Sequence, residues 1–497
     1  MTDLLALDAG AVVAGIGDGS FRAVDIATAY LAQRTAVEPW LSATLAAVPE
    51  QDVLAQASAI DRARAAGHEL GPLAGVPVAL KDIFVTRGLA TTCGSRILSG
   101  WQPPYQGTHA QRLLDAGAIL LGKLAMDEFA MGCSSENTPF TPVQNPWSTE
   151  HVAGGSSGGS AAAVSARTAC VTLGSDTGGS IRQPASLCNV VGLKPTYGRV
   201  SRAGMIAFAS SLDQAGPLCR TVADAARVLG VIAGHDPADA TSLAAPVPDY
   251  LAACNAGVAG LRIGVDRSIL DQPGLQPAVR QAFDQALTVL RDAGAITVDI
   301  TLPHQNYGIA CYYILCCAEA ASNLARYDGL RYGPQQTGTD LQATYRATRD
   351  AGFGAEVKRR ILLGTHVLRA DCYETHYGRA MRVRTLIARD FAQAFAHCDL
   401  IASPTSPVAG IARGTTQRDP LELYLSDVFT VGANLAGLPA ISIPAGFTTP
   451  ESGPSLPIGF QLIGPHLAEP TLLAAAASHQ ARTSWHRQVP SRIQEDA

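Results

Sequence analysis

The stretch from Gly154 to Ser180 decides the fold of this chain. It opens with Gly154-Gly155-Ser156-Ser157-Gly158-Gly159-Ser160 and closes with Asp176-Thr177-Gly178-Gly179-Ser180. An alanine-rich apolar stretch at 161–164 and a β-type run at 170–173 lie between the two clusters. This spacing leaves room for a loop, a helix and a strand. A chain that folds back through these elements can return Ser180 to Ser156.

A base for these hydroxyl groups must come from elsewhere, because no histidine lies in or beside either cluster. Lys81 directly follows the strand-like run 76–80 and is the obvious substitute. Its ordinary pKa is far above neutrality, so the site must desolvate the amine, or place it near other positive charge, to free its lone pair. We therefore predict that Ser180 is the nucleophile and that Ser156 relays its proton to Lys81.

The glycines of the second cluster suggest an anion-stabilising loop. Gly178 and Gly179 let the backbone turn so that several N–H groups point at one oxygen, as an oxyanion hole requires. Two other interpretations remain open: each cluster alone is typical of a flexible turn, and a phosphate cradle is conceivable. The phosphate cradle is disfavoured because neither cluster continues into the Gly-Lys-Ser/Thr of a nucleotide-binding loop.

The two clusters resemble the signature motif of the amidase signature family, at residues 154–160 and from Gly174 to Pro184. This resemblance implies that Lys81, Ser156 and Ser180 form a Ser-cisSer-Lys triad in which a cis peptide bond precedes Ser156. It also implies oxyanion donors from Thr177, Gly178 and Gly179. The implied fold is the α/β amidase signature fold, a mixed β-sheet core covered by helices on both faces.

Composition fits a large enzyme. The chain has 497 residues, of which 47% are hydrophobic and 16% charged, and no linker or repeat interrupts residues 70–485. We expect an N-terminal helical segment over 1–68, with helices from Ser20 to about Arg34 and from Glu50 to Ala66, and a catalytic domain over 69–490. The remaining β-type runs that predict a mixed sheet are 118–121, 261–265, 296–300, 400–402, 441–444 and 458–463.

Several classes of function are disfavoured. The eleven cysteines contain no Cys-x-x-Cys and the eleven histidines form no metal-binding motif, so we expect no metal. The N-terminus lacks the basic start of a signal peptide and no apolar run reaches bilayer-spanning length, which predicts a cytoplasmic protein with reduced thiols and no membrane partner. A net charge of −5 without a basic tract argues against this chain making most of any nucleic-acid contact.

Candidate substrate residues lie in the second half. A free amino acid presents a carboxylate and an ammonium, so its pocket needs an arginine for bidentate recognition and a carboxylate. Arg360 and Asp427 could be that pair. A structural salt bridge made by Arg360 is the open alternative.

Nearly the whole chain resembles one branch of this family, the A subunits of bacterial aspartyl/glutamyl-tRNA amidotransferases. The resemblance implies that Tyr312, Arg360 and Asp427 hold glutamine. Cys133 and the stretch 431–433 depart from the usual pattern beside the pocket, which leaves the fine selectivity open.

The implied function is hydrolysis of glutamine to glutamate and ammonia, which serves the ATP-dependent conversion of Glu-tRNA(Gln) to Gln-tRNA(Gln), or of Asp-tRNA(Asn) to Asn-tRNA(Asn). A separate B subunit would use ATP and Mg²⁺ and make most contacts with the aminoacyl-tRNA. A small C subunit would brace the resulting heterotrimer, and this chain itself would bind no cofactor. The alternatives are a free-standing amidase that acts on another small amide and a catalytically silent scaffold.

Overall fold

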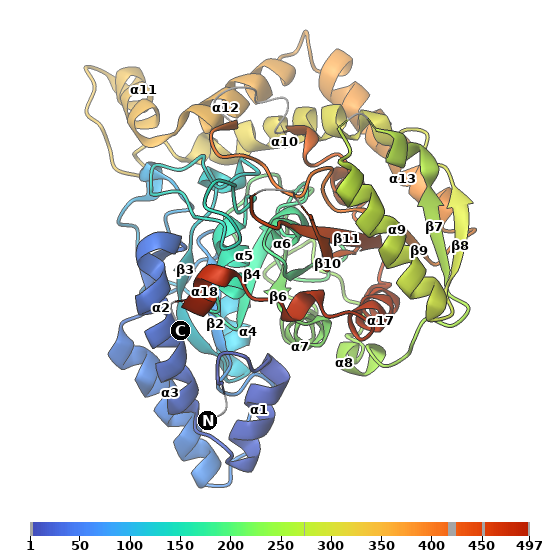
Figure 1. Cartoon of the computed structure of the whole chain (residues 1–497). Coiled ribbons are helices and arrows are strands. Elements are labelled where there is room, and N and C mark those ends of the chain that lie inside the picture. Colours follow the sequence, from blue (N-terminus) through green and yellow to red (C-terminus); the bar gives the residue numbers. More distant parts are fainter. Residues whose placement is uncertain (1–2, 273, 416–423, 450–452, 496–497) are drawn as a thin grey trace.

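The computed structural model describes residues 3–272, 274–415, 424–449 and 453–495. Its centre is a mixed sheet of eleven strands in the order β1-β3-β2-β4-β6-β5-β10-β11-β9-β7-β8 (Figure 1). Strand β2 runs parallel to β3 and β4, and β7 runs parallel to β8 and β9. The other pairings are antiparallel. The α/β class with a mixed sheet is confirmed.

The strands are β1 (Thr44–Ala47), β2 (Pro77–Lys81), β3 (Ile119–Leu124), β4 (Val171–Asp176), β5 (Val191–Lys194), β6 (Gln214–Cys219), β7 (Arg262–Asp266), β8 (Ile296–Ile300), β9 (Leu400–Pro404), β10 (Ala440–Phe447) and β11 (Pro457–Ile463). The α-helices are α1 (Ala9–Asp18), α2 (Ala23–Leu41), α3 (Glu50–Ala65), α4 (Thr108–Asp115), α5 (Gly158–Ser165), α6 (Arg182–Leu187), α7 (Val222–Ile232), α8 (Tyr250–Ala253), α9 (Pro277–Asp292), α10 (Gly308–Asn323), α11 (Leu341–Gly352), α12 (Ala355–Val367), α13 (Arg379–Ala394), α16 (Val431–Leu435), α17 (Glu469–Gln480) and α18 (Ser491–Glu495).

Each β-type run named from the sequence lies within or overlaps a strand, and β8 has its expected limits. Three strands were not expected. Strand β6 contains Gly216 and Pro217, which are weak strand formers, and it forms because β4 and β5 supply partners on both sides. Strands β1 and β5 have only four residues each, too few to give a periodic signal.

Helices cover both faces of the sheet. Helix α5 packs on β2, β3, β4 and β6, and its neighbour α6 packs on β5, β10 and β11. Helices α7, α17 and α9 form a second contiguous layer on β5, β6, β8, β9, β10 and β11. Because α5 and α7 both contact β6, and α6 and α17 both contact β10, the sheet lies between the two layers.

The N-terminal segment contains the expected helices, but it also contributes a strand to the central sheet. Helix α3 has nearly its predicted limits, whereas α2 begins at Ala23 after an Arg22 cap and continues to Leu41, beyond the predicted range. Strand β1 pairs with β3 at the sheet edge. Buried side chains of the first helices join the same hydrophobic core as the sheet, so a division at residue 68 stays a prediction.

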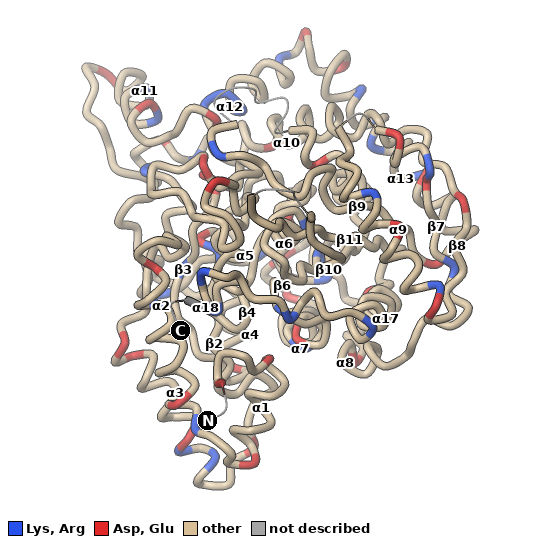
Figure 2. Tube along the Cα trace, viewed as in Figure 1, with Lys and Arg blue, Asp and Glu red and all other residues tan. Residues whose placement is uncertain are grey.

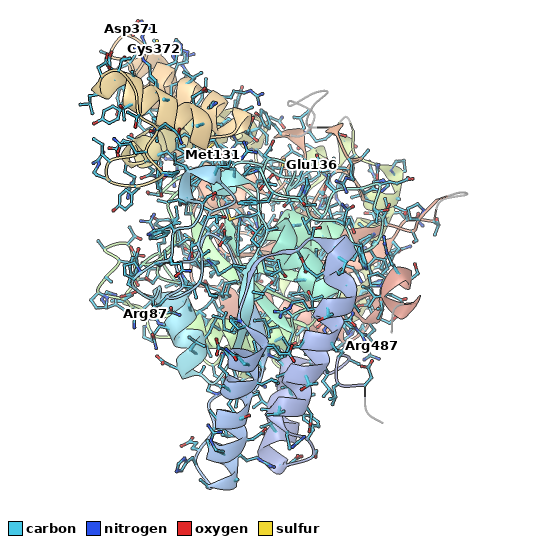
Figure 3. All side chains as sticks on the ribbon, turned by 90° about the vertical axis from the view of Figure 1, so that its left-hand side faces the viewer. Arg87, Met131, Glu136, Asp371, Cys372 and Arg487 are labelled. Atoms are coloured by element: carbon cyan, nitrogen blue, oxygen red, sulfur yellow. The ribbon has the colours of Figure 1, made fainter. Side chains whose placement is uncertain are left out.

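The last helix contacts the N-terminal part of the chain. In α18, Arg492 stacks over the ring of Trp40 in α2, with 4.2 Å from its guanidinium carbon to the ring centre. In the rotated view the N-terminal helices and the turn at Asp371 and Cys372 lie at opposite ends of the molecule (Figure 3). Acidic and basic residues are interspersed over the outer helices (Figure 2).

One helix corrects the expectation that no apolar run reaches membrane-spanning length. Among the described residues, the 22-residue helical stretch Gln305–Arg326, which includes α10, has a mean hydropathy of 1.2 and is long enough to cross a membrane. Half of its apolar window is buried inside the protein. Because α10 packs against α12 and α13, it has the character of a core helix.

A buried ion pair lies directly beside the end of β2. Lys123 of β3 donates to Asp82 Oδ1 at 3.0 Å and to Thr91 Oγ1 at 2.8 Å, and neither charged side chain is exposed. Thr92 donates to the other oxygen of Asp82. Burial lowers the pKa of Lys123, and the contact with Asp82 opposes that shift.

Replacement of Lys123 by methionine should destabilise the protein by about 3–5 kcal/mol, because it leaves the Asp82 carboxylate buried without its cation. Thermal melting followed by circular dichroism measures the change. Arg267→Gln is the matched control: it breaks the exposed pair between Arg267 and Asp299 and should leave the melting temperature unchanged. Equal shifts in the melting temperatures of the two variants would show that the buried Lys123–Asp82 pair contributes no more to stability than the exposed pair.

Candidate functional site

Parallel pairing of β2 and β4 brings the two halves of the predicted site together. Leu80 is in register with Leu173, so Lys81 at the end of β2 and residues 176–180 after β4 emerge at the same edge of the sheet. The loop with Ser156 leads directly into α5, which packs on both strands. The expected loop, helix and strand are therefore all present.

Lys81 is fully buried and surrounded by hydroxyl groups. Its Nζ lies 2.7 Å from Ser156 Oγ, 2.9 Å from Ser157 Oγ and 2.9 Å from Ser175 Oγ. Burial lowers the pKa of Lys81 to about 7, although Asp127 and other acidic groups nearby oppose the shift. A neutral amine keeps a lone pair, so one of these hydroxyls can donate its proton to Lys81.

Ser156 and Ser180 occupy adjacent loops. The peptide bond between Gly155 and Ser156 is cis, and Ser157 N–H donates to the backbone oxygen of Ser180 at 3.2 Å. Ser180 keeps 8% of its surface exposed, whereas Ser156 is fully buried. The Lys81–Ser156 half of the predicted relay is therefore formed. Within the described chain no hydrogen bond joins the two serine hydroxyls, so the Ser156–Ser180 step stays a prediction.

A buried charge cluster that the sequence analysis did not identify fixes the nucleophile loop. Asp176 accepts bonds from Arg182, Asn434 and the N–H groups of Gly179 and Ile181. Burial alone would raise the pKa of Asp176, but the contacts with Arg182 and other donors lower it to about 2. In the sequence, only the place of Arg182 within the signature motif indicated that it could hold this loop.

The predicted oxyanion loop is closely packed. A side chain at Gly178 would collide with the ring of Tyr312, and one at Gly179, where φ is +141°, would collide with Thr430. The N–H of Gly179 donates to Asp176 at 2.9 Å, whereas in the described residues the N–H groups of Thr177 and Gly178 have no acceptor. Thr177 and Gly178 therefore have the freer donors, and an oxyanion role for Gly179 remains a prediction.

Two of the three predicted substrate residues lie directly against this loop. The ring of Tyr312, in α10, covers Gly178. Thr430 Oγ1 donates to the backbone oxygens of both Gly178, at 2.6 Å, and Asp427, at 3.0 Å. The turn with Asp427 is thus tied to the loop that ends in Ser180.

Among the described residues, no cation is paired with the Asp427 carboxylate. Its Oδ1 is buried without a hydrogen-bond partner. Burial and the nearby charge of Asp176 raise the pKa of Asp427 to about 8, although Arg182 and Arg360 oppose the shift. A ligand ammonium would supply the missing partner.

Arg360 is buried beside the same pocket but is not paired with Asp427. Its Nε donates to Glu356 Oε1 at 2.7 Å, so the salt bridge considered as an alternative does exist. In the described chain the hydrogen bonds of the Arg360 side chain come from Nε alone. Within the described part of the chain the two terminal amino groups have no hydrogen-bond partner, and a substrate role for Arg360 stays a prediction.

The two departures from the family pattern also lie near this pocket. Cys133 is buried, its sulfur accepts from Ser426 Oγ at 3.6 Å, and its backbone oxygen accepts from Gln183. Val431 and Gly432 begin α16, directly after Thr430. Their effect on selectivity stays a prediction.

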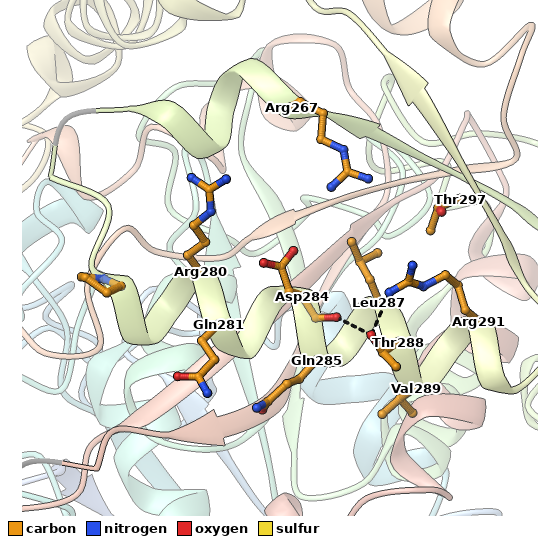
Figure 4. Close-up of a pocket in the computed structure, with 11 residues that line it drawn as sticks. Arg267, Arg280, Gln281, Asp284, Gln285, Leu287, Thr288, Val289, Arg291 and Thr297 are labelled. Atoms are coloured by element: carbon orange, nitrogen blue, oxygen red, sulfur yellow. Dashed lines mark hydrogen bonds between the residues drawn. The ribbon is translucent and has the colours of Figure 1, made fainter.

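One cavity lies apart from the predicted site residues. A broad pocket of about 810 Å³ runs along α9, where Arg267, Arg280 and Arg291 line it with polar side chains (Figure 4). Arg267 and Arg280 are already paired with acidic residues. Among the described residues no group of three or more histidine, cysteine, aspartate or glutamate side chains could hold a metal ion.

Comparison with known proteins gives a consistent result. A family profile described as Amidase matches residues 25–473. The chain is 51% identical over 490 residues to the A subunit of glutamyl-tRNA(Gln) amidotransferase from Chloroflexus aurantiacus, covering 99% of both chains. It is 53% identical over 465 residues to the corresponding protein of Moorella thermoacetica, covering 93% of this chain and 94% of the relative.

Solved structures show the same architecture. The crystal structure of the glutamyl-tRNA(Gln) amidotransferase A subunit from Thermotoga maritima matches with a TM-score of 0.75 and 38% identity, covering 91% of this chain and 90% of that one. The native peptide amidase of Stenotrophomonas maltophilia matches with a TM-score of 0.79 and 33% identity, covering 96% of both chains.

The geometry at Lys81 predicts a pH dependence. Because only the neutral amine can accept a proton, hydrolysis of a primary amide should rise about tenfold per pH unit below pH 7 and level off above about pH 8. The pH profile of kcat measures this. Lys81→Arg, which stays charged, should lose activity by several orders of magnitude at every pH. A wild-type profile that is flat from pH 5 to 9 would contradict Lys81 as the base.

Proposed function

The chain belongs to the amidase signature family, and we propose on that basis that it is the glutamine-hydrolysing A subunit of a tRNA-dependent amidotransferase. The observation that carries the proposal is a pair of buried, opposite charges near the loop that ends in Ser180. Among the described residues, Asp427 Oδ1 has no hydrogen-bond partner and no cation pairs with the Asp427 carboxylate, while the terminal amino groups of Arg360 have no hydrogen-bond partner. Free glutamine presents the complementary ammonium and carboxylate at one end and an amide at the other.

The chemistry follows from the triad. Ser180 Oγ attacks the side-chain carbonyl of glutamine while its proton passes through Ser156 to Lys81. The N–H groups of Thr177 and Gly178 would stabilise the negative oxygen, and Gly179 could join them if its bond to Asp176 opens. The relay returns the proton to the leaving ammonia. Water then cleaves the ester, which releases glutamate and restores Ser180.

Substrate recognition would divide between three residues. Arg360 would hold the α-carboxylate with its two terminal amino groups, and Asp427 would hold the ammonium. Binding of that ammonium would bring the pKa of Asp427 back down and keep the carboxylate charged. The Tyr312 ring would close the pocket above Gly178.

The ammonia requires an acceptor. We propose a B subunit that uses ATP and Mg²⁺ to activate Glu-tRNA(Gln), or Asp-tRNA(Asn), and makes most of the tRNA contacts, with a small C subunit completing a cytoplasmic heterotrimer. The match to the amidotransferase relatives over nearly their full length supports this assembly. This chain would bind no cofactor of its own.

Arg360→Lys and Asp427→Asn should each weaken the use of glutamine by at least about tenfold in kcat/KM and leave a neutral primary amide almost unaffected, because only glutamine presents both charges. Steady-state assays on glutamine and butanamide measure the two losses. Arg291→Lys, at an exposed position of α9, is the control. Equal losses on both amides would make the two residues structural.

Ser180→Ala should abolish glutamine-dependent amidation of tRNA, while the complex still amidates tRNA when ammonium salt and ATP are added. The nucleophile is needed only to produce ammonia, so its loss leaves the acceptor site intact. Formation of Gln-tRNA(Gln) measures both reactions in the complex purified from its host. Failure of ammonium to rescue an intact complex would favour the alternative, a free-standing amidase.

A further inference from the structure

Glu356 contacts both parts of the proposed substrate site. One part is Arg360, and the other is the segment from Tyr424 to Asp427. It is in the first turn of α12 and is buried. Its Oε1 accepts from Arg360 Nε at 2.7 Å and from the Tyr424 hydroxyl at 2.9 Å. One carboxylate oxygen thus joins the arginine of one substrate end to the segment that leads to Asp427.

The second oxygen of Glu356 faces outward. Oε2 pairs with Arg359, whose side chain is 54% exposed. One oxygen of Glu356 therefore contacts the buried residues Arg360 and Tyr424, and the other contacts the half-exposed Arg359. Variants of Tyr424 and Arg359 can therefore be compared to separate the two kinds of contact.

Aromatic rings hold the Arg360 guanidinium in place. The rings of Tyr313, Tyr424 and Phe208 have their centres 5.0, 5.7 and 5.8 Å from its central carbon. The rings of Tyr313 and Tyr424 lie 4.1 Å apart, centre to centre. Rings can hold the plane of a guanidinium but not its rotation within that plane, which the Nε–H bond to Glu356 fixes.

Tyr424 is connected to Asp427, the residue proposed to bind the substrate ammonium, through a backbone turn. Its backbone oxygen accepts from Asp427 N–H at 3.3 Å. The hydroxyl of the same residue is held by Glu356. A displacement of Glu356 would therefore act on Arg360 and on the Asp427 turn together.

We propose that Glu356 is a positioning residue for substrate recognition: it orients Arg360 and tethers Tyr424, so that the sites for the carboxylate and the ammonium of one amino acid keep a fixed separation. The inference rests on the proposed function, because that separation matters only for a substrate with both charges. Glu356 touches neither the reacting atoms nor the triad. Its loss should act on substrate affinity and leave the chemical step intact.

The test compares three variants. Glu356→Gln should raise the KM for glutamine about tenfold and change kcat by less than about threefold, since only positioning is lost. Tyr424→Phe keeps the ring and removes the hydroxyl, so it should raise KM in the same direction by a smaller factor. The double variant should lose less than the product of the two single losses, because both changes act on the same hydrogen bond: one replaces its charged acceptor with a neutral amide oxygen and the other removes its donor. Arg359→Gln, the control on the outward oxygen, should stay within about twofold of wild type.

Assays use the complex as purified from its host, with glutamine and butanamide as substrates. Butanamide hydrolysis should be unchanged in all variants, which also shows that each variant is folded. If Glu356→Gln does not fold, Tyr424→Phe alone tests the inference: its KM for glutamine should rise while its kcat stays nearly unchanged. Equal losses on both amides, losses that multiply in the double variant, or an Arg359→Gln effect as large as that of Tyr424→Phe would each overturn the inference. A wild-type complex that cleaves butanamide but not glutamine would instead refute the proposed function, and the inference with it.

Discussion

The removal of water from the Lys81 amine is the constraint on which the site depends. An ammonium buried without a counter-charge costs several kcal/mol, more than a few neutral hydrogen bonds return. No carboxylate touches Nζ among the described residues, and three serine hydroxyls surround it. The amine therefore loses its proton near neutrality. The small residues of the 154–160 loop follow from the same requirement, because larger side chains would push the hydroxyls away from the lysine.

The residues proposed for chemistry and those proposed for recognition come from separate stretches of the chain. The triad and its loops lie between Lys81 and Arg182, whereas the pocket residues lie between Tyr312 and Asp427. The two stretches contact each other directly, for example where Gly354 N–H donates to Glu128. Just after the second stretch lies a seam of buried bonds: Thr430 bonds to Gly178, and Asn434 bonds to Asp176. Arg182 completes the seam with a bond to the backbone oxygen of Thr430 at 3.1 Å.

The features that could be predicted from the sequence are those that short local motifs encode. The serine clusters and Lys81 are local motifs on predictable strands, so their convergence could be inferred from parallel pairing. Strand β6 could not, because Pro217 conceals it and only its neighbours hold it in place. The partners of Asp176 were also missed, since Asn434 is 258 positions away. For Arg360 the sequence left a choice between salt bridge and substrate contact; the contact with Glu356 confirms the salt bridge, and the substrate contact stays a prediction.

The seam also constrains how this architecture can change over evolutionary time. Substitutions within the pocket stretch can alter which amide is accepted without touching the nucleophile, because no triad residue is drawn from that stretch. Thr430 and Asn434 are different, since they lie directly after the pocket stretch and are hydrogen-bonded to Gly178 and Asp176 of the catalytic stretch. A lineage that acquires a new substrate is therefore free to vary most of the pocket wall. Those two positions should be the last to diverge.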